Sequence, residues 1–136
     1  MAETNISKTH TGIASEFFVA AELARRNFNV TLTFGNTKAI DLLVEKDDKL
    51  FSVQVKGIQR KKSICWNLSI KKIKETYLYV FVNLNSDTFE VPEFFILTGL
   101  EALKFVKPTN TGRDYIDYNF LKNQTDSANR WDKFTI

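Results

Sequence analysis

Four polar residues stand where they could carry chemistry. Asp41 interrupts the apolar run of residues 39–44, and Glu16 falls at the edge of the apolar face of a predicted helix. Gln54 and Lys56 share one face of a predicted strand, because side chains two residues apart point the same way. A carboxylate beside a core needs a cation, a metal ion or hydrogen-bond donors. These residues are therefore the first candidates for a functional site.

Carboxylate, amide and backbone carbonyl oxygens together make a hard site of the kind that holds Mg²⁺. A neighbouring ammonium group could orient or help to deprotonate a water molecule that attacks a phosphodiester. His10 and Cys65 are the only histidine and cysteine of the chain. A Cys–His pair, a cysteine-rich zinc site and an internal disulfide framework are thereby disfavoured, which leaves carboxylates, amides and lysines to do any chemistry.

The elements that must position these residues can be predicted from local patterns. A helix is expected over 11–26, ending at Asn27, and strands over 29–34, 39–45 and 50–56. A hairpin turn near residues 47–48 would pair residues whose numbers sum to about 95, which sets Asp41 opposite Gln54. A helix packed on this sheet could bring Glu16 to the same place. The helix is expected to bury one apolar face, made of Ile13, Phe17, Ala20, Leu23, Ala24 and Phe28.

The second half of the chain alternates further strands and helices. We expect a short basic helix over 69–75, strands over 76–84 and 93–97, and a helix over 99–106 with Thr98 as N-cap. The aromatic face formed by Tyr77, Tyr79 and Phe81 fits either a core or an interface. Residues 109–136 show no clear pattern, although Trp131 is expected to anchor them. The element order indicates an α/β fold in one domain spanning residues 1–136.

Composition and charge narrow the class of protein. The 136 residues are 43% hydrophobic and 26% charged, which suits a compact fold, and no segment has the length of a membrane span. The N-terminus lacks the apolar core of a signal peptide, and a cytoplasmic location is expected. The net charge of +3 arises in the first half: residues 1–68 carry 10 basic and 7 acidic residues, and residues 69–136 carry 9 of each. The stretch 56–74 contains no acidic residue, which favours contact with nucleic acid, although a solvated surface remains open.

The helix with Glu16, the AIDLLV strand with Asp41 and the Gln54-Val55-Lys56 strand resemble the PD-(D/E)XK nuclease superfamily, and within it the Holliday-junction-resolvase-like and Mrr-like domains. The resemblance covers about residues 9–84, with residues 85–136 as an extension. It implies a restriction-endonuclease-like domain with a central mixed β-sheet flanked by helices, in the core order helix, three strands, helix, strand. Ile40 stands where the family has proline. Gln54 stands at the position of the second acid, as in several such domains.

The resemblance also implies roles and partners. Asp41 would be the principal ligand of Mg²⁺ or Mn²⁺, joined by the Gln54 amide oxygen, the Val55 carbonyl and Glu16, either directly or through water. Lys56 would stabilise the attacking hydroxide or the phosphate. DNA would be the partner, and no membrane would be involved. The chain could also form a homodimer. The expected DNA contacts are Arg60, Lys61, Lys62, Lys71, Lys72 and Lys74. The implied activity is metal-dependent DNA cleavage. The alternative is a weak or inactive module of the same fold that binds nucleic acid or a protein.

Overall fold

The computed structural model describes residues 7–33, 40–59 and 65–135. A five-stranded mixed sheet in the order β1-β2-β3-β5-β6 forms its centre, in which only β3 and β5 run parallel. Its strands are β1 (Asn29–Leu32), β2 (Leu42–Lys46), β3 (Lys49–Ile58), β5 (Leu78–Asn83) and β6 (Glu93–Thr98). The remaining elements are α1 (Lys8–Ala24), β4 (Cys65–Asn67), η1 (Ile70–Lys72), α2 (Gly99–Phe105), β7 (Tyr115–Asp117), α3 (Tyr118–Gln124) and η2 (Trp131–Thr135).

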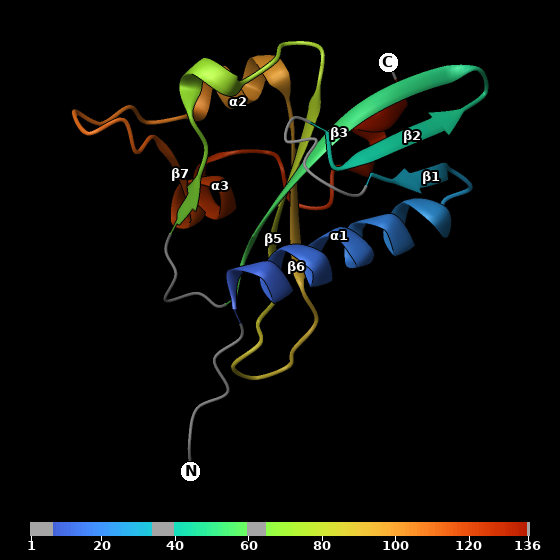
Figure 1. Cartoon of the computed structure of the whole chain (residues 1–136), viewed down its shortest axis with the longest axis horizontal. Helices are drawn as coiled ribbons and strands as arrows, with labels where there is room; N and C mark the ends of the chain where they lie inside the picture. Colours follow the sequence, from blue (N-terminus) through green and yellow to red (C-terminus); the bar gives the residue numbers. More distant parts are fainter. Residues whose placement is uncertain (1–6, 34–39, 60–64, 136) are drawn as a thin grey trace.

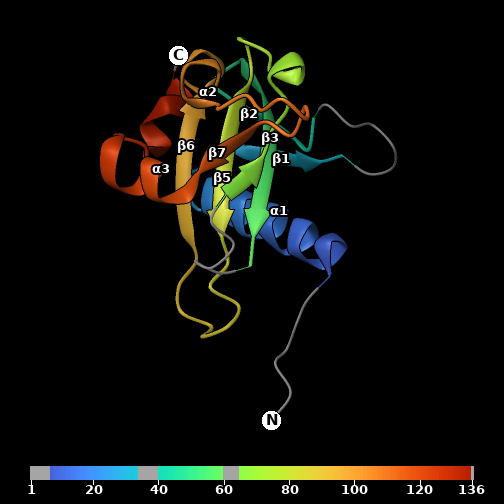
Figure 2. The same ribbon diagram turned by 90° about the vertical axis from the view of Figure 1, so that its left-hand side faces the viewer.

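Both faces of the sheet are covered, so that the fold has three layers. One core unites α1 and η2 with the side chains of Val53, Val55 and Val80. The opposite core unites β4, β7, α2 and α3 with those of Tyr79 and Phe81. In Figure 1, α3 and β7 accordingly lie to the left of β5 and β6, whereas most of α1 lies to the right, and Figure 2 shows the sheet from the β7 side. The expected α/β class with a mixed sheet flanked by helices is confirmed.

The hairpin of β2 and β3 has the register that the sequence predicts. Leu42 pairs with Val53 and Lys46 with Lys49, so that paired residue numbers sum to 95. Asp47 and Asp48 form the two-residue turn with φ of 52° and 66°. Two consecutive residues with positive φ are typical of the type I′ turn, whose twist matches that of the strands. The turn thus fixes which residues of β2 and β3 face each other.

The residues at the ends of α1 and α2 cap or terminate these helices. Ser7 caps α1 by accepting the backbone N–H of His10, and Asn27 adopts a φ of 70° just beyond the helix. Thr98 caps α2, and the Glu101 side chain accepts the Thr98 backbone N–H in return, which completes a capping box. The helix predicted over 99–106 is therefore confirmed.

Half of the predicted apolar face of α1 is wrong, because only Ala20, Leu23 and Phe28, which follows the helix, are buried. The helix buries Thr11, Ser15, Val19, Ala20 and Leu23, of which only Ala20 and Leu23 belong to the predicted apolar face. The residues Ile13 and Phe17 are instead 47% and 54% exposed, and Ala24 is exposed as well. The physical reason is a close approach of Ser15 to β3, described below, which requires a small side chain and turns the larger apolar ones outward.

The connection from β3 to β5 differs from the expected helix over 69–75. Its described residues form a three-residue 3-10 turn, η1, and the strand β4, which pairs with β7 in a second, two-stranded sheet. This small sheet places Trp66 on the main sheet, where its Nε1–H donates to the Val82 carbonyl at 3.0 Å. The aromatic face of β5 is therefore core: Tyr79 and Phe81 have no exposed surface.

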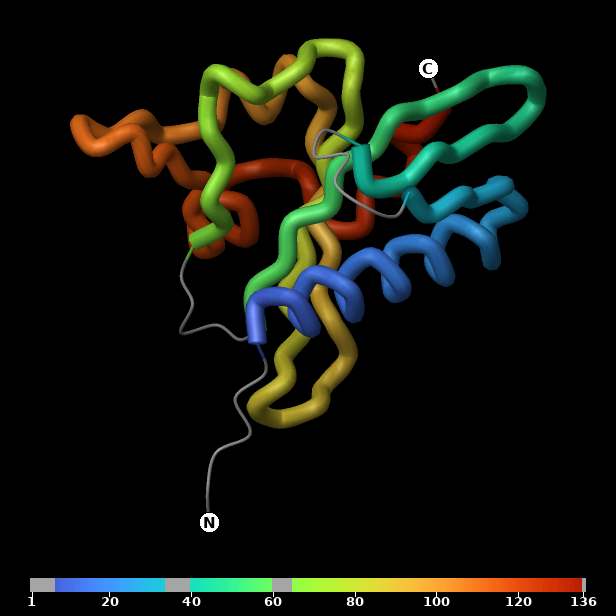
Figure 3. The backbone as a smooth tube through the Cα atoms, viewed as in Figure 1, coloured from blue at the N-terminus to red at the C-terminus, as the bar shows by residue number. Residues whose placement is uncertain are grey.

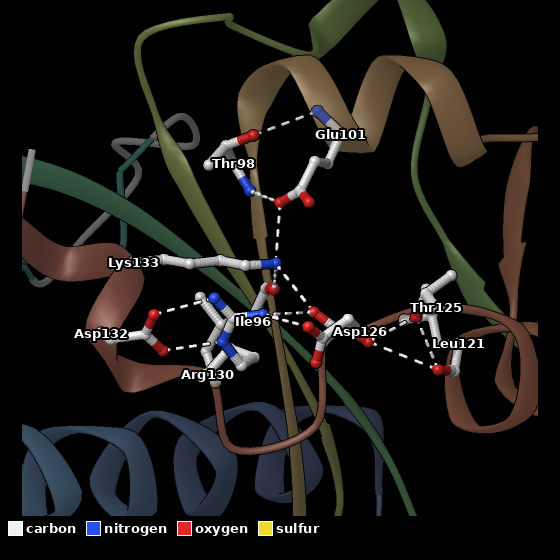
Figure 4. A network of polar contacts seen from close by, with 10 residues as sticks. Ile96, Thr98, Glu101, Leu121, Thr125, Asp126, Arg130, Asp132 and Lys133 are labelled. Atoms are coloured by element: carbon white, nitrogen blue, oxygen red, sulfur yellow. Dashed lines mark hydrogen bonds and ion pairs between the residues drawn. The ribbon is translucent and has the colours of Figure 1, made fainter.

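Residues 127–135 complete the fold at β6. The Ser127 carbonyl accepts the Ile96 N–H, and the Asn129 N–H donates to the Phe94 carbonyl, each at 2.9 Å. Lys133 donates to the Ile96 carbonyl and to Glu101, both at 2.8 Å (Figure 4). Trp131 is only 6% exposed, which confirms its predicted role as an anchor. The segment thereby covers an edge of the sheet that would otherwise offer unpaired backbone groups.

Candidate active site

Asp41 lies where β2 begins and holds the neighbouring strand through its side chain. Its backbone N–H donates to the Val53 carbonyl at 2.9 Å, and its Oδ2 atom accepts the Val55 N–H at 2.8 Å. Where the backbone hydrogen bonds between β2 and β3 end, the Asp41 carboxylate thus provides the next hydrogen bond to β3. Among the described residues, no hydrogen bond to its Oδ1 atom occurs, which leaves that oxygen for another ligand.

β3 carries the other two expected residues of the nuclease motif. Gln54 and Lys56 are half-buried. Val53, which precedes Gln54, and Val55, which stands between the two polar residues, belong to the core on the α1 side. In the parallel pairing with β5, Gln54 lies beside Tyr79 and Lys56 beside Phe81. Gln54 and Lys56 therefore project from the same face of β3, as expected.

Glu16 reaches the site because α1 packs closely on β3. Ser15, which is fully buried, donates its hydroxyl to the Thr11 carbonyl at 2.7 Å. A Cβ atom added to Gly57 would lie 2.1 Å from the Ser15 Oγ atom, so this contact requires glycine at position 57. Gly57 follows Lys56 directly and thus sets the position of α1 next to the site. The sequence analysis did not identify this role, although a glycine inside an otherwise regular strand is a signal for close backbone approach.

Electrostatic coupling shows that three of the residues lie together. Burial raises the pKa of Glu16 to about 7, and the charge of Asp41 contributes to this shift. Burial also raises the pKa of Asp41, while the Val55 N–H and the Lys56 ammonium lower it. Burial lowers the pKa of Lys56, which Asp41 raises and Lys72 lowers further. Asp41 is thus coupled by charge both to Glu16 and to Lys56.

The donor set fits a hard cation that binds through both acidic and neutral oxygens. Two carboxylates that are partly buried and raise each other's energy would both be stabilised by a nearby positive ion. Among the described residues, no group of three or more His, Cys, Asp or Glu side chains could hold a metal ion. A metal ion here would therefore need neutral ligands beside Asp41 and Glu16, and the Gln54 amide and the Val55 carbonyl are the neutral oxygens expected from the sequence.

A pocket of about 410 Å³ adjoins Lys56. Its described walls come from the first turns of α1, from the end of β3 and from β4, and none of the described residues that line it is acidic. Figure 3 shows the end of β3 reaching the first turn of α1. Lys8 and Lys56 contribute two cationic side chains, and Gly12 leaves open space, since a Cβ atom there would meet no atom within 4 Å. The pocket therefore suits an anionic group.

The basic residues expected to contact DNA are only partly described. Arg60, Lys61 and Lys62 lie outside the described residues. Lys71 and Lys72 belong to η1 and, like Lys74, are exposed. Lys72 is close enough to lower the pKa of Lys56. At least Lys72 of the basic stretch therefore lies near Lys56.

Comparison of the structure with known proteins identifies the fold. A bacterial homing endonuclease superposes with a TM-score of 0.55 and 14% sequence identity, over 70% of this chain and 67% of its own. The Holliday junction resolvase Hjc of Archaeoglobus fulgidus superposes with a TM-score of 0.53 and 13% identity, over 82% and 87% of the two chains. Both have the restriction-endonuclease-like fold.

This chain therefore has the restriction-endonuclease-like fold that the sequence predicts. Identities of this size establish the fold alone. No protein-family model matches the sequence, and no curated protein is significantly similar to it. Among the described residues, no helix has both the length and the apolar character needed to cross a membrane.

Proposed function

We propose that this protein is a metal-dependent DNA endonuclease that hydrolyses phosphodiester bonds with Mg²⁺ or Mn²⁺. The observation that carries the proposal is the coupling of Asp41 to both Glu16 and Lys56, beside a pocket in which no acidic residue occurs among the described lining residues. The fold supports it, because the two similar structures are a homing endonuclease and a Holliday junction resolvase.

In this proposal, Asp41, Gln54, the Val55 carbonyl and Glu16 hold the metal ion. The bound ion would supply positive charge for the phosphate and lower the pKa of a water molecule. Without the metal ion, burial and the charge of Asp41 raise the pKa of Glu16 to about 7, and a bound cation would favour its ionised form, which can serve as a ligand. The attacking water would give up its proton to solvent. Lys56 places an ammonium group where negative charge develops on the phosphate. A bond forms between water oxygen and phosphorus, the ester bond to the leaving oxygen breaks, and that oxygen takes up a proton.

DNA would approach along the basic stretch that leads away from Lys56. We assign contacts with the DNA backbone to Lys71, Lys72 and Lys74, and from the sequence alone to Arg60, Lys61 and Lys62, because lysine and arginine bind phosphates by charge and release counterions. The pocket beside Lys56 would receive a nucleotide next to the bond that is cut, since Lys8 and Lys56 line it and the part of its lining that the structure describes contains no acidic residue.

A second candidate function is a weakly active or inactive module that binds nucleic acid or a protein. Gln54 favours it, because a neutral amide in place of a carboxylate lowers the affinity for a divalent cation. A titration with Mn²⁺ separates the two functions. Saturable binding that is lost in Asp41→Asn supports the enzyme, whereas no binding at millimolar metal supports the module.

Cleavage is tested with branched, duplex and single-stranded DNA in the presence of Mg²⁺ or Mn²⁺. Asp41→Asn removes the charge while leaving an oxygen that can accept the Val55 N–H, so loss of activity would not reflect loss of the strand contact. Asp48→Asn, the same change in the exposed hairpin turn, serves as the control. We expect cleavage by the wild type and by the control only. Absence of cleavage on every substrate, or equal cleavage by Asp41→Asn, would refute the endonuclease.

A further inference from the structure

The chain between β4 and β5 presents lysine side chains and contributes little to the core. Of residues 70–76, only Ile73 is buried, whereas Lys71, Lys72 and Lys74 are exposed. Like charges this close in the chain repel one another. Such a segment needs contacts from elsewhere in the molecule to keep a single conformation.

Asp114, which precedes β7, holds the start of this segment. The residue is only 6% exposed, and its Oδ2 atom accepts the Ile70 N–H at 2.9 Å. Its Oδ1 atom accepts the Thr109 N–H at 3.2 Å, and its carbonyl accepts the Leu68 N–H at 3.0 Å. Within the part of the chain that the structure describes, Ser69, the N-cap residue of η1, makes no capping hydrogen bond with its own side chain. Asp114 thus caps η1 from a position 44 residues beyond Ile70.

Two further contacts hold the other end of the segment. The hydroxyl of Tyr79, a residue with no exposed surface, accepts the Lys74 N–H at 2.8 Å. The helix α2 begins directly against the same residue, since a Cβ atom added to Gly99 would lie 2.2 Å from the Lys74 carbonyl oxygen. The backbone that carries Lys71 and Lys72 is therefore fixed at both ends.

The carboxylate of Asp114 is used to fix the backbone of a cationic segment. Both of its oxygens accept backbone N–H groups, while Lys71 and Lys72 remain exposed. Lys72 lies close enough to Lys56 to lower the pKa of that ammonium group, so η1 stands near the candidate site. Cations that are already held in place bind a chain of phosphates with a smaller loss of conformational entropy.

We propose that Asp114 is a positioning residue for DNA binding, which holds η1 so that Lys71 and Lys72 face the phosphate backbone. These lysines act as proposed above, so this role rests on the proposed function, but it does not require that the bound DNA be cleaved. Loss of Asp114 makes the protein more positive by one charge, which by itself would tighten the binding of DNA. If Asp114 positions the lysines, its loss weakens the binding instead.

Binding of a fluorescent duplex DNA without divalent metal, measured over a series of KCl concentrations, tests the proposal. For Asp114→Ala we expect a Kd at least about threefold higher and a dependence of log Kd on log salt that is shallower by about one, because each phosphate contact contributes about 0.9 to this slope. Asp117→Ala is the matched control. It loses the same charge and also a backbone hydrogen bond, since the Asp117 side chain accepts the Phe120 N–H at 2.8 Å and caps α3. The control should bind DNA at least as tightly as the wild type.

A second background separates positioning from a general structural role. In a chain with Lys71→Met and Lys72→Met, the further change Asp114→Ala should alter the Kd by less than about twofold, because the residues through which Asp114 acts are gone. Circular dichroism checks that the variants are folded. If Asp114→Ala does not fold, Asp114→Asn, which keeps one oxygen for the Ile70 N–H, takes its place and should bind DNA more weakly than Asp117→Asn.

The outcomes also distinguish this role from the proposed cleavage. Binding of DNA by Asp114→Ala that equals or exceeds that of the wild type, equal weakening by both aspartate variants, or the same weakening with and without the two lysines would overturn the role of Asp114. A wild type that binds no duplex DNA at low salt would overturn it as well. Binding that follows the expected pattern, without cleavage on any substrate, would refute the endonuclease and leave the role of Asp114 supported.

Discussion

The Oδ2 atom of Asp41 accepts the backbone N–H of Val55 at 2.8 Å. Val55 stands between Gln54 and Lys56, so the acid at the centre of the candidate site also fixes the backbone that carries its two neighbours. This contact explains why aspartate is found at the start of a strand, where its propensity is poor. The structural and the chemical role of Asp41 can be separated by substitution, because the first needs an oxygen and the second a charge.

Substitutions of Asp41 should therefore differ in stability. Asp41→Ala is expected to lower the free energy of unfolding by about 1–3 kcal/mol, because the partly buried Val55 N–H loses its acceptor. Asp41→Asn should cost less, since its amide oxygen can accept the same hydrogen bond. Urea unfolding without divalent metal measures both variants. Equal losses would show that the hydrogen bond to Val55 does not stabilise the fold.

The stability of the metal-free protein should depend on the protonation of Glu16. Its pKa is raised from 4.5 to about 7 in the folded protein, so the folded state binds the proton more tightly than the unfolded state does. The free energy of unfolding should therefore fall as the pH rises from about 4.5 to about 7. Because the side chain is half-exposed and screened by solvent, we expect a loss on the order of 1 kcal/mol.

Glu16→Gln isolates this effect from other titrating groups. The difference in unfolding free energy between this variant and the wild type should grow in favour of the variant over the same pH range. Urea unfolding at several pH values measures it. A difference that stays constant with pH would mean that Glu16 has no raised pKa.

Two glycines near the site should respond in opposite ways to alanine. Gly57→Ala would place a Cβ atom 2.1 Å from the Ser15 Oγ atom and is expected to destabilise the protein by at least about 1 kcal/mol. Gly12→Ala, inside α1, meets no atom within 4 Å and should stabilise the protein by about 0.5–1 kcal/mol, because alanine favours the helix. Thermal unfolding of both variants checks the prediction. Destabilisation by both would contradict the open space described at Gly12.

Lys56 should serve activity at the expense of stability. Burial lowers the pKa of its ammonium group, because the folded protein solvates the charged form less well than water does. Lys56→Met keeps the length of the side chain and removes the charge. We expect cleavage of DNA to fall by about 10²–10⁴ and the free energy of unfolding to stay constant or to rise.

Lys71→Met is the control for this experiment, because Lys71 is exposed on η1. It should retain cleavage at saturating DNA, since a residue that contacts only the backbone contributes to binding. A large loss of stability in Lys56→Met, accompanied by a matching loss in cleavage, would assign Lys56 a structural role instead.

The features that the sequence predicted correctly depend on interactions between near neighbours. The Asp47-Asp48 turn sets the β2–β3 register over a few residues, and the Thr98 cap acts within one turn of α2. The same is true of the end of α1 near Asn27. Asp41, Gln54 and Lys56 could be grouped from sequence because one hairpin contains all three.

The features that were missed depend on residues far apart in the chain. The face that α1 buries is decided by Ser15 meeting Gly57, which no periodicity within the helix reveals. β4 exists because Trp66 pairs with Ile116 on β7, and each strand has only three residues and so a weak pattern of its own. The pocket combines α1, β3 and β4, and it could not be predicted before the positions of α1 and β4 were known.

The docking of residues 127–135 has a consequence for folding during synthesis. Trp131 and Phe134 complete the core that α1 begins, and Phe134 contacts the rings of Phe28 and Phe51. A ribosome must therefore translate more than one hundred residues after Phe28 before this aromatic cluster can close. Until then, the nascent chain exposes the part of its core that Trp131 and Phe134 later cover and the edge of β6, and such surfaces favour aggregation and capture by chaperones.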